Sequence, residues 1–459
     1  MAKQHYDLLV IGSGAAGSSA VTTIDKKGLR IALVERGKLG GTCLNYGCDP
    51  TKSLLYIANM LYEARHASKY GLHIPEAEAD WAAVQQWTQD IISRLRGGTP
   101  DQARAKLTQQ GIDVLEGEAR FLSAHEISVS GYNDTISAER IIIATGSETL
   151  IPPIEGLDQA DYITNIQAVS LPTLPRRMAI AGGGAIGIEF AQLFHRFGVE
   201  VTVLERGPNI LDTEDLELAT RLCKLLTEEG IRLETNAELK RVQGNGDSKR
   251  LTIQCGERDQ EELEVDELLI AVGRRAAFAS LNLEAAGVKT SKKGIIVDET
   301  LRTSVPHIWA AGDVASPYQF THVASEQGKL AVHNAFSSNP QPFDDRVIPW
   351  GIFTYPPLAH VGKTEQQLQQ DKVEYRAACV SFNENERAIT GGKTEGLIKL
   401  LVDAKGTILG GHILGTRADD LLAPLVLAMH ASVPIQTLAS TILPYPTVSE
   451  IVRLVAEKL

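Results

Sequence analysis

Two stretches of the chain share one pattern of apolar and polar positions. In the first stretch, an apolar run at 6–11 precedes a glycine-rich turn, a helical run and a second apolar run at 30–34. In the second stretch the apolar runs are 178–181 and 200–204, and the helical run between them extends through Phe197. Continuous apolar runs of this length are typical of strands buried on both faces of a parallel sheet. The pattern therefore predicts two copies of a strand-helix-strand unit.

Each copy carries Gly-x-Gly-x-x-Gly before its helix and an acidic residue 18 positions after the third glycine, from 17 to 35 and from 187 to 205. In dinucleotide-binding folds these glycines permit a tight turn, close approach of the pyrophosphate and close helix packing. The helix N-terminus offers free N–H groups and partial positive charge to the phosphates. The alternative is two ordinary glycine-rich turns. We interpret the copies as two nucleotide sites, formed by Gly12, Gly14, Gly17 and Glu35 and by Gly182, Gly184, Gly187 and Glu205.

The rest of the chain indicates further strands and a separate C-terminal domain. Apolar runs at 141–144, 268–272 and 308–311 each end at a glycine turn, where open α/β sheets bind ligands. From about Asp345 the pattern changes, with strands expected at 398–402 and 407–413 and helices at 418–431 and 435–440. We therefore predict an α/β fold with two Rossmann-like nucleotide-binding domains plus a C-terminal α+β domain.

Composition narrows the class of protein. A chain of 459 residues is too long for one ordinary core and fits two or three domains. The net charge of −12 argues against a nucleic-acid surface. No apolar run reaches the roughly 18 residues of a membrane span, and the N-terminus does not resemble a secretion signal. We expect a cytoplasmic protein with neither nucleic acid nor membrane as a partner.

Two of the five cysteines, Cys43 and Cys48, stand together in the segment GGTCLNYGCDPTK. Five residues of regular helix turn about 500°, so the two thiols would lie about 140° apart, and a disulfide would need a distorted turn. Gly47 and Pro50 make such a distortion plausible. Two structural thiols, or half of a metal site, are the alternatives, but no second Cys or His cluster has ligand spacing. We therefore predict a redox-active pair and no metal site.

The chain resembles the FAD-dependent pyridine nucleotide-disulfide oxidoreductases, the family of dihydrolipoamide dehydrogenase, glutathione reductase and mercuric reductase, over essentially its whole length. The resemblance rests on the cysteine segment, both glycine motifs, ATGS (144–147), AVGR (271–274), AGDV (311–314), THVASEQG (321–328) and YPTVSE (445–450). It implies a homodimer with an FAD domain (1–150 and 271–344), an NAD(P) domain (151–270) and an interface domain (345–459).

The resemblance also implies roles for individual residues. In such enzymes the cysteine at the position of Cys48 faces the flavin, and the one at the position of Cys43 exchanges with the substrate. Lys52 and Glu189 would pair beside the flavin. The alternative for Lys52 and Glu189 is a surface salt bridge without a catalytic role. FAD would be held by Gly12, Gly14, Gly17, Glu35, Gly41, Thr42, Lys52, Ala119, Thr145, Gly146 and Asp313. The nicotinamide nucleotide would be held by Gly182, Gly184, Gly187, Glu205 and Gly273. Glu205 can accept from a ribose 2′-hydroxyl and repel a 2′-phosphate, which predicts NADH, while Arg206 leaves NADPH open.

Three positions depart from the family pattern. Tyr445 stands where relatives carry the His of His-Pro-Thr-x-x-Glu, although Glu450 is retained. A tyrosine pKa near 10 lies about three units, or roughly 4 kcal/mol, from a base ready at neutral pH. Tyr445 therefore suits hydrogen-bond donation or a site for a soft metal or thiolate, as in mercuric reductase. The other departures are Asp49, which would raise the pKa of Cys48, and Ala185, which predicts an open nicotinamide pocket.

The sequence indicates the substrate less directly than it indicates the cofactors. Mercuric reductases usually carry a C-terminal cysteine pair and an N-terminal metal-capturing domain, and neither pattern occurs in this sequence. We expect a reductase of a disulfide, an oxidised sulfur species or a thiol-bound metal. The alternatives are a dihydrolipoamide dehydrogenase with Tyr445 in place of the usual His, and a non-catalytic flavoprotein scaffold.

Overall fold

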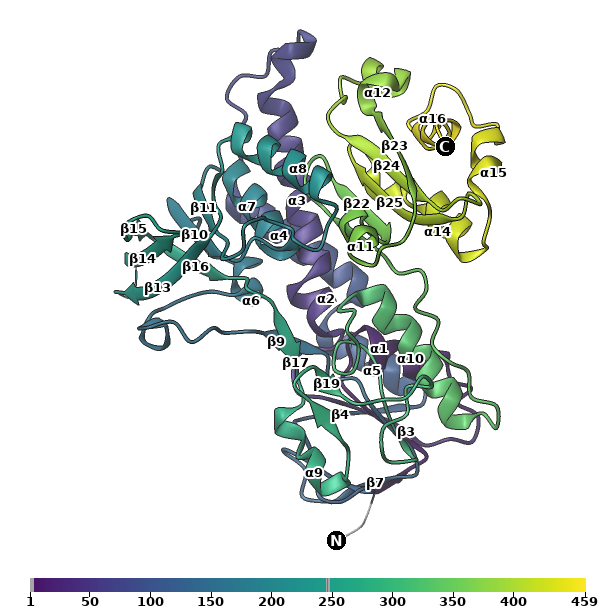
Figure 1. The fold of residues 1–459 in the computed structure, drawn as a ribbon. Coiled ribbons are helices and arrows are strands. Elements are labelled where there is room, and N and C mark those ends of the chain that lie inside the picture. Colours follow the sequence, from purple (N-terminus) through teal and green to yellow (C-terminus); the bar gives the residue numbers. More distant parts are fainter. Residues whose placement is uncertain (1–3, 245, 247) are drawn as a thin grey trace. The chain divides into compact units, whose positions relative to one another are not determined.

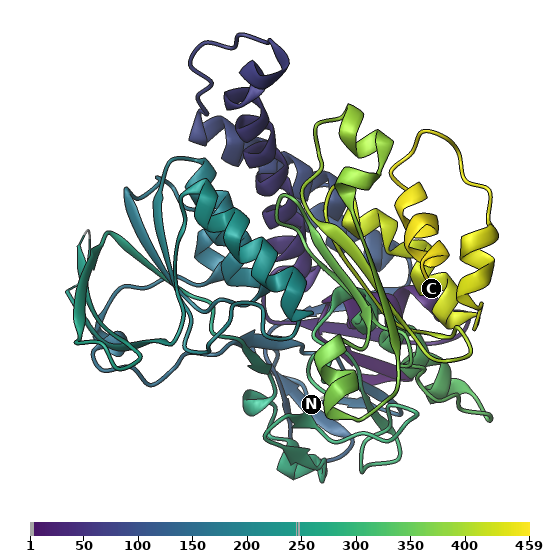
Figure 2. The same ribbon diagram turned by 45° about the horizontal axis from the view of Figure 1, so that its top comes forward.

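The computed structural model describes residues 4–244, 246 and 248–459. It contains two compact units, which Figures 1 and 2 draw from two directions. The first unit is made of the residues up to Ser53 together with Ala82–Leu150 and Gly273–Asp344. The second is made of Leu54–Trp81, Ile151–Val272 and Asp345–Leu459.

The centre of the first unit is a five-stranded parallel sheet in the order β20-β8-β2-β3-β4. Its strands are β2 (Leu8–Ile11), β3 (Ile31–Glu35), β4 (Ile112–Glu116), β8 (Ile141–Ile143) and β20 (Ile308–Ala310). Every residue of β2, β8 and β20 is buried, as the apolar runs predict. The carboxyl ends of these strands meet at one edge, so the glycine loop after β2 lies beside Ala144: a Cβ on Gly12 would lie 2.3 Å from its carbonyl oxygen.

Helices α1 (Ala15–Thr23) and α10 (Thr321–Phe336) pack against each other beside this sheet. Gly328 allows their close approach, because a Cβ there would lie 2.1 Å from the Ala16 carbonyl oxygen. The predicted strand 6–11 is divided at Asp7, because β1 (Gln4–Tyr6) pairs with β7 in a separate sheet. The other elements of this unit are β5 (Ala119–Phe121), β6 (Glu126–Val129), β7 (Ile136–Ala138), β9 (Ser147–Thr149), β17 (Arg274–Ala276), β18 (Thr290–Ser291), β19 (Gly294–Ile295), α2 (Gly41–Tyr46), α5 (Pro100–Gln109), η3 (Ala279–Leu281) and α9 (Leu283–Ala286). Helices α3 (Cys48–Arg65) and α4 (Trp81–Arg96) begin or end in the second unit.

The second glycine motif lies in a four-stranded parallel sheet of the second unit, in the order β12-β11-β10-β16. The strands are β10 (Arg177–Ala181), β11 (Glu200–Leu204), β12 (Arg232–Glu234) and β16 (Glu267–Ile270). The other elements of this part of the second unit are η1 (Ala67–Tyr70), η2 (Leu157–Gln159), α6 (Asn165–Ala168), α7 (Ala185–Arg196), α8 (Leu216–Glu229) and an antiparallel sheet of β13 (Ala237–Gln243), β14 (Lys249–Cys255) and β15 (Glu261–Val265). The predicted repeat of the strand-helix-strand unit is thus confirmed.

The C-terminal part of the second unit contains a five-stranded antiparallel sheet in the order β21-β22-β25-β24-β23, as an α+β domain requires. Its elements are β21 (Pro349–Ile352), β22 (Leu358–Gly362), α11 (Glu365–Gln370), β23 (Arg376–Ser381), η4 (Phe382–Glu384), α12 (Glu386–Thr390), β24 (Leu397–Val402), β25 (Ile408–Leu414), α13 (Ala418–Leu421), α14 (Ala423–His430), α15 (Ile435–Ser440) and α16 (Glu450–Glu457). The single helix predicted at 418–431 is wrong. It divides at Leu422, because Pro424 has no N–H and is accommodated only in the first turn of a helix.

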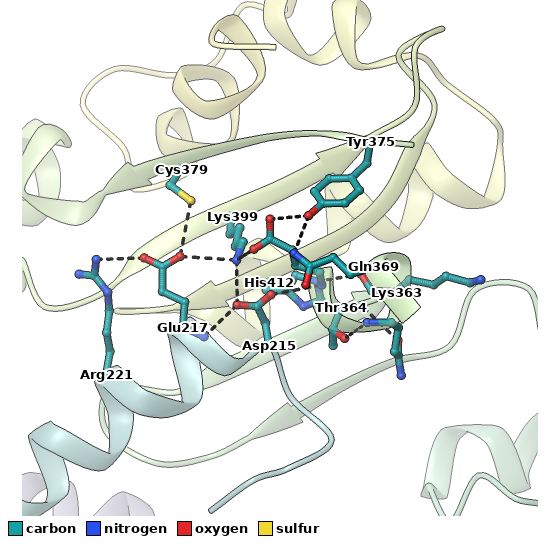
Figure 3. Close-up of polar contacts among 12 residues, drawn as sticks. Asp215, Glu217, Arg221, Lys363, Thr364, Gln369, Tyr375, Cys379, Lys399 and His412 are labelled. Atoms are coloured by element: carbon teal, nitrogen blue, oxygen red, sulfur yellow. Dashed lines mark hydrogen bonds and ion pairs between the residues drawn. The ribbon is translucent and has the colours of Figure 1, made fainter. Parts of the chain in front are cut away.

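A buried lysine joins the two parts of the second unit (Figure 3). Lys399 of β24 places its Nζ 2.6 Å from Glu365 Oε2, 3.1 Å from Asp215 Oδ1 and 3.5 Å from Glu217 Oε2. Burial alone would lower the pKa of Lys399, but Glu365 and Asp215 raise it above its ordinary value. Asp215 also caps the N-terminus of α8. The start of α8 is therefore fixed to the antiparallel sheet.

Across the residues that the structure describes, no helix is both long enough and apolar enough to span a membrane.

Candidate functional site

The cysteine pair lies in the first unit, at the break between α2 and the start of α3. Helix α2 ends at Tyr46, Gly47 has φ −129° and ψ −114°, and α3 begins at Cys48. A Cβ on Gly47 would lie 3.1 Å from the carbonyl oxygen of Thr42 and 3.3 Å from the Cα of Cys43. The chain therefore turns tightly enough to bring Cys43 and Cys48, both free thiols, into a hydrogen bond. The predicted distortion of the turn is confirmed.

The two thiols have opposite acidities. A hydrogen bond from Cys43 lowers the pKa of Cys48 to about 6 against the effect of burial, with help from Thr321 and Lys52. Thr321 Oγ1 lies 3.4 Å from Cys48 Sγ. The same hydrogen bond, together with burial, raises the pKa of Cys43. Near neutral pH the pair therefore holds one thiolate, on Cys48, and one proton, on Cys43.

Asp49 acts on Cys48, as the sequence predicts, and also on Cys43. Burial raises the pKa of its own carboxyl, and the charge of Lys52 opposes this. The negative charge of Asp49 raises the pKa of Cys43 and of Cys48. For Cys48 this effect is outweighed, because the thiolate receives hydrogen bonds from Cys43 and Thr321.

The first glycine loop is shaped for a dinucleotide. A Cβ on Gly17 would lie 1.8 Å from the Gly12 carbonyl oxygen, so the third glycine is needed for the helix to pack on the turn. Gly14, at the N-terminus of α1, has open space around its Cβ position. Thr145 Oγ1, next to the end of β8, is buried and has no hydrogen-bond partner within the described part of the chain. A buried hydroxyl without a hydrogen-bond partner is able to bind a polar group of a ligand.

Four other residues assigned to FAD have defined surroundings. Glu35 accepts hydrogen bonds from the N–H and Oγ of Ser13 and from the N–H of Gly37, at 2.7–2.8 Å. Gly41 has φ +64° and packs on Gly14: a Cβ on Gly41 would lie 2.6 Å from the Cα of Gly14. Gly146 also has positive φ, +69°. Ala119 is buried in β5, opposite Val129.

The second glycine loop repeats this geometry. A Cβ on Gly187 would lie 2.0 Å from the Gly182 carbonyl oxygen, and Gly184 faces open space. Glu205 accepts hydrogen bonds from the N–H groups of Gly183 and Gly207, at 2.7 and 2.6 Å. Ala185 is exposed at the N-terminus of α7. The loop thus presents a second open helix N-terminus for a nucleotide.

Three further residues predicted to be catalytic, Glu189, Tyr445 and Glu450, lie in the second unit, whereas Lys52 lies in the first unit. Glu189 is only 5% exposed, and its Oε1 accepts a hydrogen bond from the N–H of Phe353 at 2.9 Å. Tyr445 is 70% exposed and donates its hydroxyl to Glu386, which raises the tyrosine pKa. Glu450 Oε2 accepts from the N–H of Thr447. Tyr445 is therefore a donor and not a ready base.

Three residues that contact the predicted site had no role in the sequence-based assignment. Thr321 contacts Cys48, Ser147 donates to Asp313, and Arg274 donates to Ser147. Each belongs to a motif that marked the family resemblance, namely THVASEQG, ATGS and AVGR. The motifs therefore indicated which segments carry these three residues, but not which hydrogen bonds the residues make.

Two dinucleotide-binding sheets and a dithiol with one acidic member define an oxidoreductase that combines nucleotide cofactors with a redox-active thiol pair. The family model described as pyridine nucleotide-disulphide oxidoreductase matches residues 6–328, and that of the dimerisation domain of the same enzymes matches residues 348–456. The chain therefore belongs to the pyridine nucleotide-disulphide oxidoreductase family. It is a flavoprotein disulfide reductase of class I, and its family uses FAD and NAD(P)H.

Relatives with two different activities resemble the chain equally well. A mercuric reductase of Streptomyces lividans is 36% identical over 458 residues, covering 98% of this chain and 96% of the relative. A dihydrolipoyl dehydrogenase of Thermus scotoductus (strain ATCC 700910 / SA-01) is 36% identical over 459 residues, covering 99% and 97%. The solved structure of the HOCl-induced flavoprotein disulfide reductase RclA from Escherichia coli is 31% identical, with a TM-score of 0.87, and covers 98% of this chain and 99% of that one. These comparisons confirm the predicted family and fold.

Proposed function

We propose that the protein is a homodimeric reductase that passes electrons from NAD(P)H through FAD to the Cys43–Cys48 pair, and on to a disulfide, an oxidised sulfur species or a thiol-bound metal ion. The observation that carries this proposal is the opposite acidity of the two thiols: the Cys48 pKa is lowered to about 6, while that of Cys43 is raised. A reductive dithiol needs one thiolate for electron exchange and one proton to deliver.

The cofactor assignments extend the geometry of the two loops. Gly12, Gly14, Gly17 and Glu35 would hold the ADP half of FAD, and Gly41, Thr42, Lys52, Ala119, Thr145, Gly146 and Asp313 would hold the rest. Gly182, Gly184, Gly187, Glu205 and Gly273 would hold the nicotinamide nucleotide. FAD, when bound, would accept hydride from the nicotinamide and supply an electron pair to the cysteine disulfide. The open helix N-termini and the unpartnered hydroxyl of Thr145 support these assignments.

The thiol chemistry then follows in balanced steps. Two electrons and one proton convert the Cys43–Cys48 disulfide into a Cys48 thiolate and a Cys43 thiol. When the shared proton moves to Cys48, the Cys43 thiolate attacks one sulfur of a substrate disulfide and releases the other sulfur as a thiolate. Cys48 loses its proton to that thiolate and attacks Cys43 Sγ, which releases the second substrate sulfur as a thiolate and restores the disulfide; this thiolate takes a proton from water.

Residues of the second unit would assist these steps. Lys52 would pair with Glu189 beside the flavin, where Glu189 is held by the N–H of Phe353. Tyr445 and Glu450 of one subunit would serve the cysteines of the other. Tyr445, whose pKa is raised, would donate a hydrogen bond to a departing thiolate or stand beside a soft metal, and would not remove a proton.

A second candidate function is dihydrolipoamide dehydrogenase, which the 36% identity to the Thermus scotoductus enzyme favours. Oxidation of free dihydrolipoamide by NAD⁺, measured beside reduction of Hg(II) and of small disulfides by NADH, separates the candidates. A non-catalytic scaffold would turn over none of them.

An anaerobic titration of the purified protein with NADH tests the electron path. A long-wavelength charge-transfer band after two electrons is expected, because the Cys48 thiolate would then contact oxidised flavin. In the C43S variant the band should be present before any NADH is added, and in C48S it should be absent. Direct bleaching of the flavin without the band would contradict the proposal.

A further inference from the structure

We propose that Arg274 is a positioning residue of the flavin side of the site: it orients Asp313 through Ser147. This inference deepens the proposed function, which assigns Asp313 to FAD and Cys48 to the flavin-facing thiol. The family resemblance gave the AVGR segment only a nicotinamide role, through Gly273.

The two-stranded ribbon of β9 and β17 places these residues together. The strands run antiparallel, with Arg274 opposite Thr149 and Ala276 opposite Ser147. Arg274 donates from Nε to Ser147 Oγ at 2.8 Å and from Nη2 to the Ser147 carbonyl oxygen at 2.7 Å. The guanidinium is thus held by two hydrogen bonds to a single residue, a geometry that a lysine cannot reproduce.

This double contact sets the direction of the next hydrogen bond. A serine hydroxyl has one hydrogen to donate and two lone pairs to accept. Because Arg274 Nε has no role except as a donor, the Ser147 oxygen accepts from it. The hydroxyl hydrogen is then directed to Asp313 Oδ2, which lies 2.5 Å away. The carboxylate of Asp313 is therefore held by a chain of donors that begins at Arg274.

The surroundings of Arg274 favour its charged form. Burial lowers the pKa of Arg274, and the negative charges of Asp313, Cys48 and Glu148 act in the opposite direction. The guanidinium is therefore held beside β9 both by its two hydrogen bonds to Ser147 and by neighbouring negative charge.

The neighbouring Arg275 offers a matched control. Successive residues of a strand point to opposite faces, and the Arg275 side chain is 62% exposed, with Nε 2.9 Å from Glu148 Oε1. An R275M variant removes an arginine from the same strand without touching Ser147. Its FAD affinity and its thiol titration should match those of the wild type.

Two measurements on the holoenzyme test the proposal. The FAD dissociation constant, from quenching of flavin fluorescence, should rise about tenfold or more in R274M and S147A, since each breaks a hydrogen-bond chain that ends at a charged group. The pH dependence of iodoacetamide alkylation of Cys48, measured in the C43S background, should stay close to that of the wild type in both variants, because Thr321 and Lys52, which lower the Cys48 pKa, are unchanged. A wild-type profile shows that the cysteine site is intact and that the loss of FAD affinity is not a general loss of structure.

The conservative variant separates positioning from charge. R274K should not restore the FAD affinity, because an ammonium keeps the charge and loses the two-bonded fork. Wild-type FAD affinity in R274M would overturn the proposal. Neither readout requires turnover, so both still apply if the electron path of the proposed function is disproved. If R274M fails to fold, the FAD affinity of S147A, which is a smaller change, still tests the proposal.

Discussion

The Sγ atom of Cys48 lies 3.4 Å from the Oγ1 atom of Thr321, the first residue of α10. Cys48 is itself the first residue of α3. Its sulfur is therefore placed at the N-terminal ends of two long helices, where partial positive charge favours a thiolate. These two helix ends, the Cys43 thiol and Lys52 together explain why the thiolate forms on Cys48 and not on Cys43.

Replacing Thr321 with valine should raise the pKa of Cys48. Valine has a similar volume but cannot donate to the thiolate, and a hydrogen bond to a charged group is worth about 1.5–3 kcal/mol, or about one to two pKa units. The pH profile of iodoacetamide alkylation in the C43S background measures the shift. T321S keeps the hydroxyl and should titrate like the wild type, and an unshifted T321V profile would show that the contact is unimportant.

The thiolate of the reduced enzyme should disappear as the pH falls through about 6, the pKa of Cys48. A depressed thiol pKa means that the anion is present above that value and is lost below it. The charge-transfer band of the two-electron-reduced enzyme should therefore be constant above pH 7 and half-lost near pH 6. D49N should shift the midpoint lower, because Asp49 opposes the thiolate; a shift to higher pH would contradict this electrostatic account.

Removing the charge of Glu205 should weaken the preference for NADH. Its carboxylate holds the N–H groups of Gly183 and Gly207 and would repel a 2′-phosphate. In E205Q the ratio of kcat/KM for NADPH to that for NADH should rise about tenfold, as expected for roughly 1.4 kcal/mol of lost repulsion. E200Q, an exposed change at the start of β11, the strand that Glu205 follows, should leave the ratio unchanged. Equal use of both nucleotides by the wild type would disprove the preference.

A tyrosine at position 185 should weaken nucleotide binding. Ala185 is exposed beside Gly184, so a large side chain there would cover the open N-terminus of α7. The dissociation constant for NADH, measured by fluorescence, should be higher in A185Y and unchanged in A185S. Equal affinity in A185Y would mean that the nucleotide does not use this opening.

Lys399 should be essential for stability. K399M leaves Asp215, whose side chain is fully buried, without its cation, and breaking a buried ion pair costs about 3–5 kcal/mol. Urea unfolding of the holoenzyme should therefore shift to a clearly lower midpoint. K363M removes an exposed pair with Asp371 and should cost less than about 1 kcal/mol. Similar losses in both variants would argue against a special role for the buried pair.

The sequence predicted what depends on local patterns. Apolar runs located the buried strands, and the glycine spacing located both loops, because Gly17 and Gly187 are required by contacts only five residues away. Gly47 indicated the break between the two cysteines for the same reason. The helix at 418–431 was predicted as continuous because the apolar pattern outweighed Pro424, which in fact begins a new helix.

Contacts between distant segments could not be predicted in this way. Ser147 and Arg274 are 127 residues apart and meet only because β9 pairs with β17. Tyr445 and Glu386 are 59 residues apart, and nothing in the tyrosine motif indicated its acceptor. The sequence could show which segments carry the site, whereas the hydrogen-bond direction and charge balance required the fold.

The position of Lys399 also bears on assembly. Its contacts with Asp215 and Glu365 fasten the first turn of α8 to strand β24, so ion pairs join the nucleotide-binding part and the dimerisation part of the second unit at this point. In a dimer formed through the dimerisation domain, each Lys399 cluster would lie on the path between the proposed nicotinamide site and the subunit interface. A change at Lys399 would then affect both nucleotide binding and subunit association.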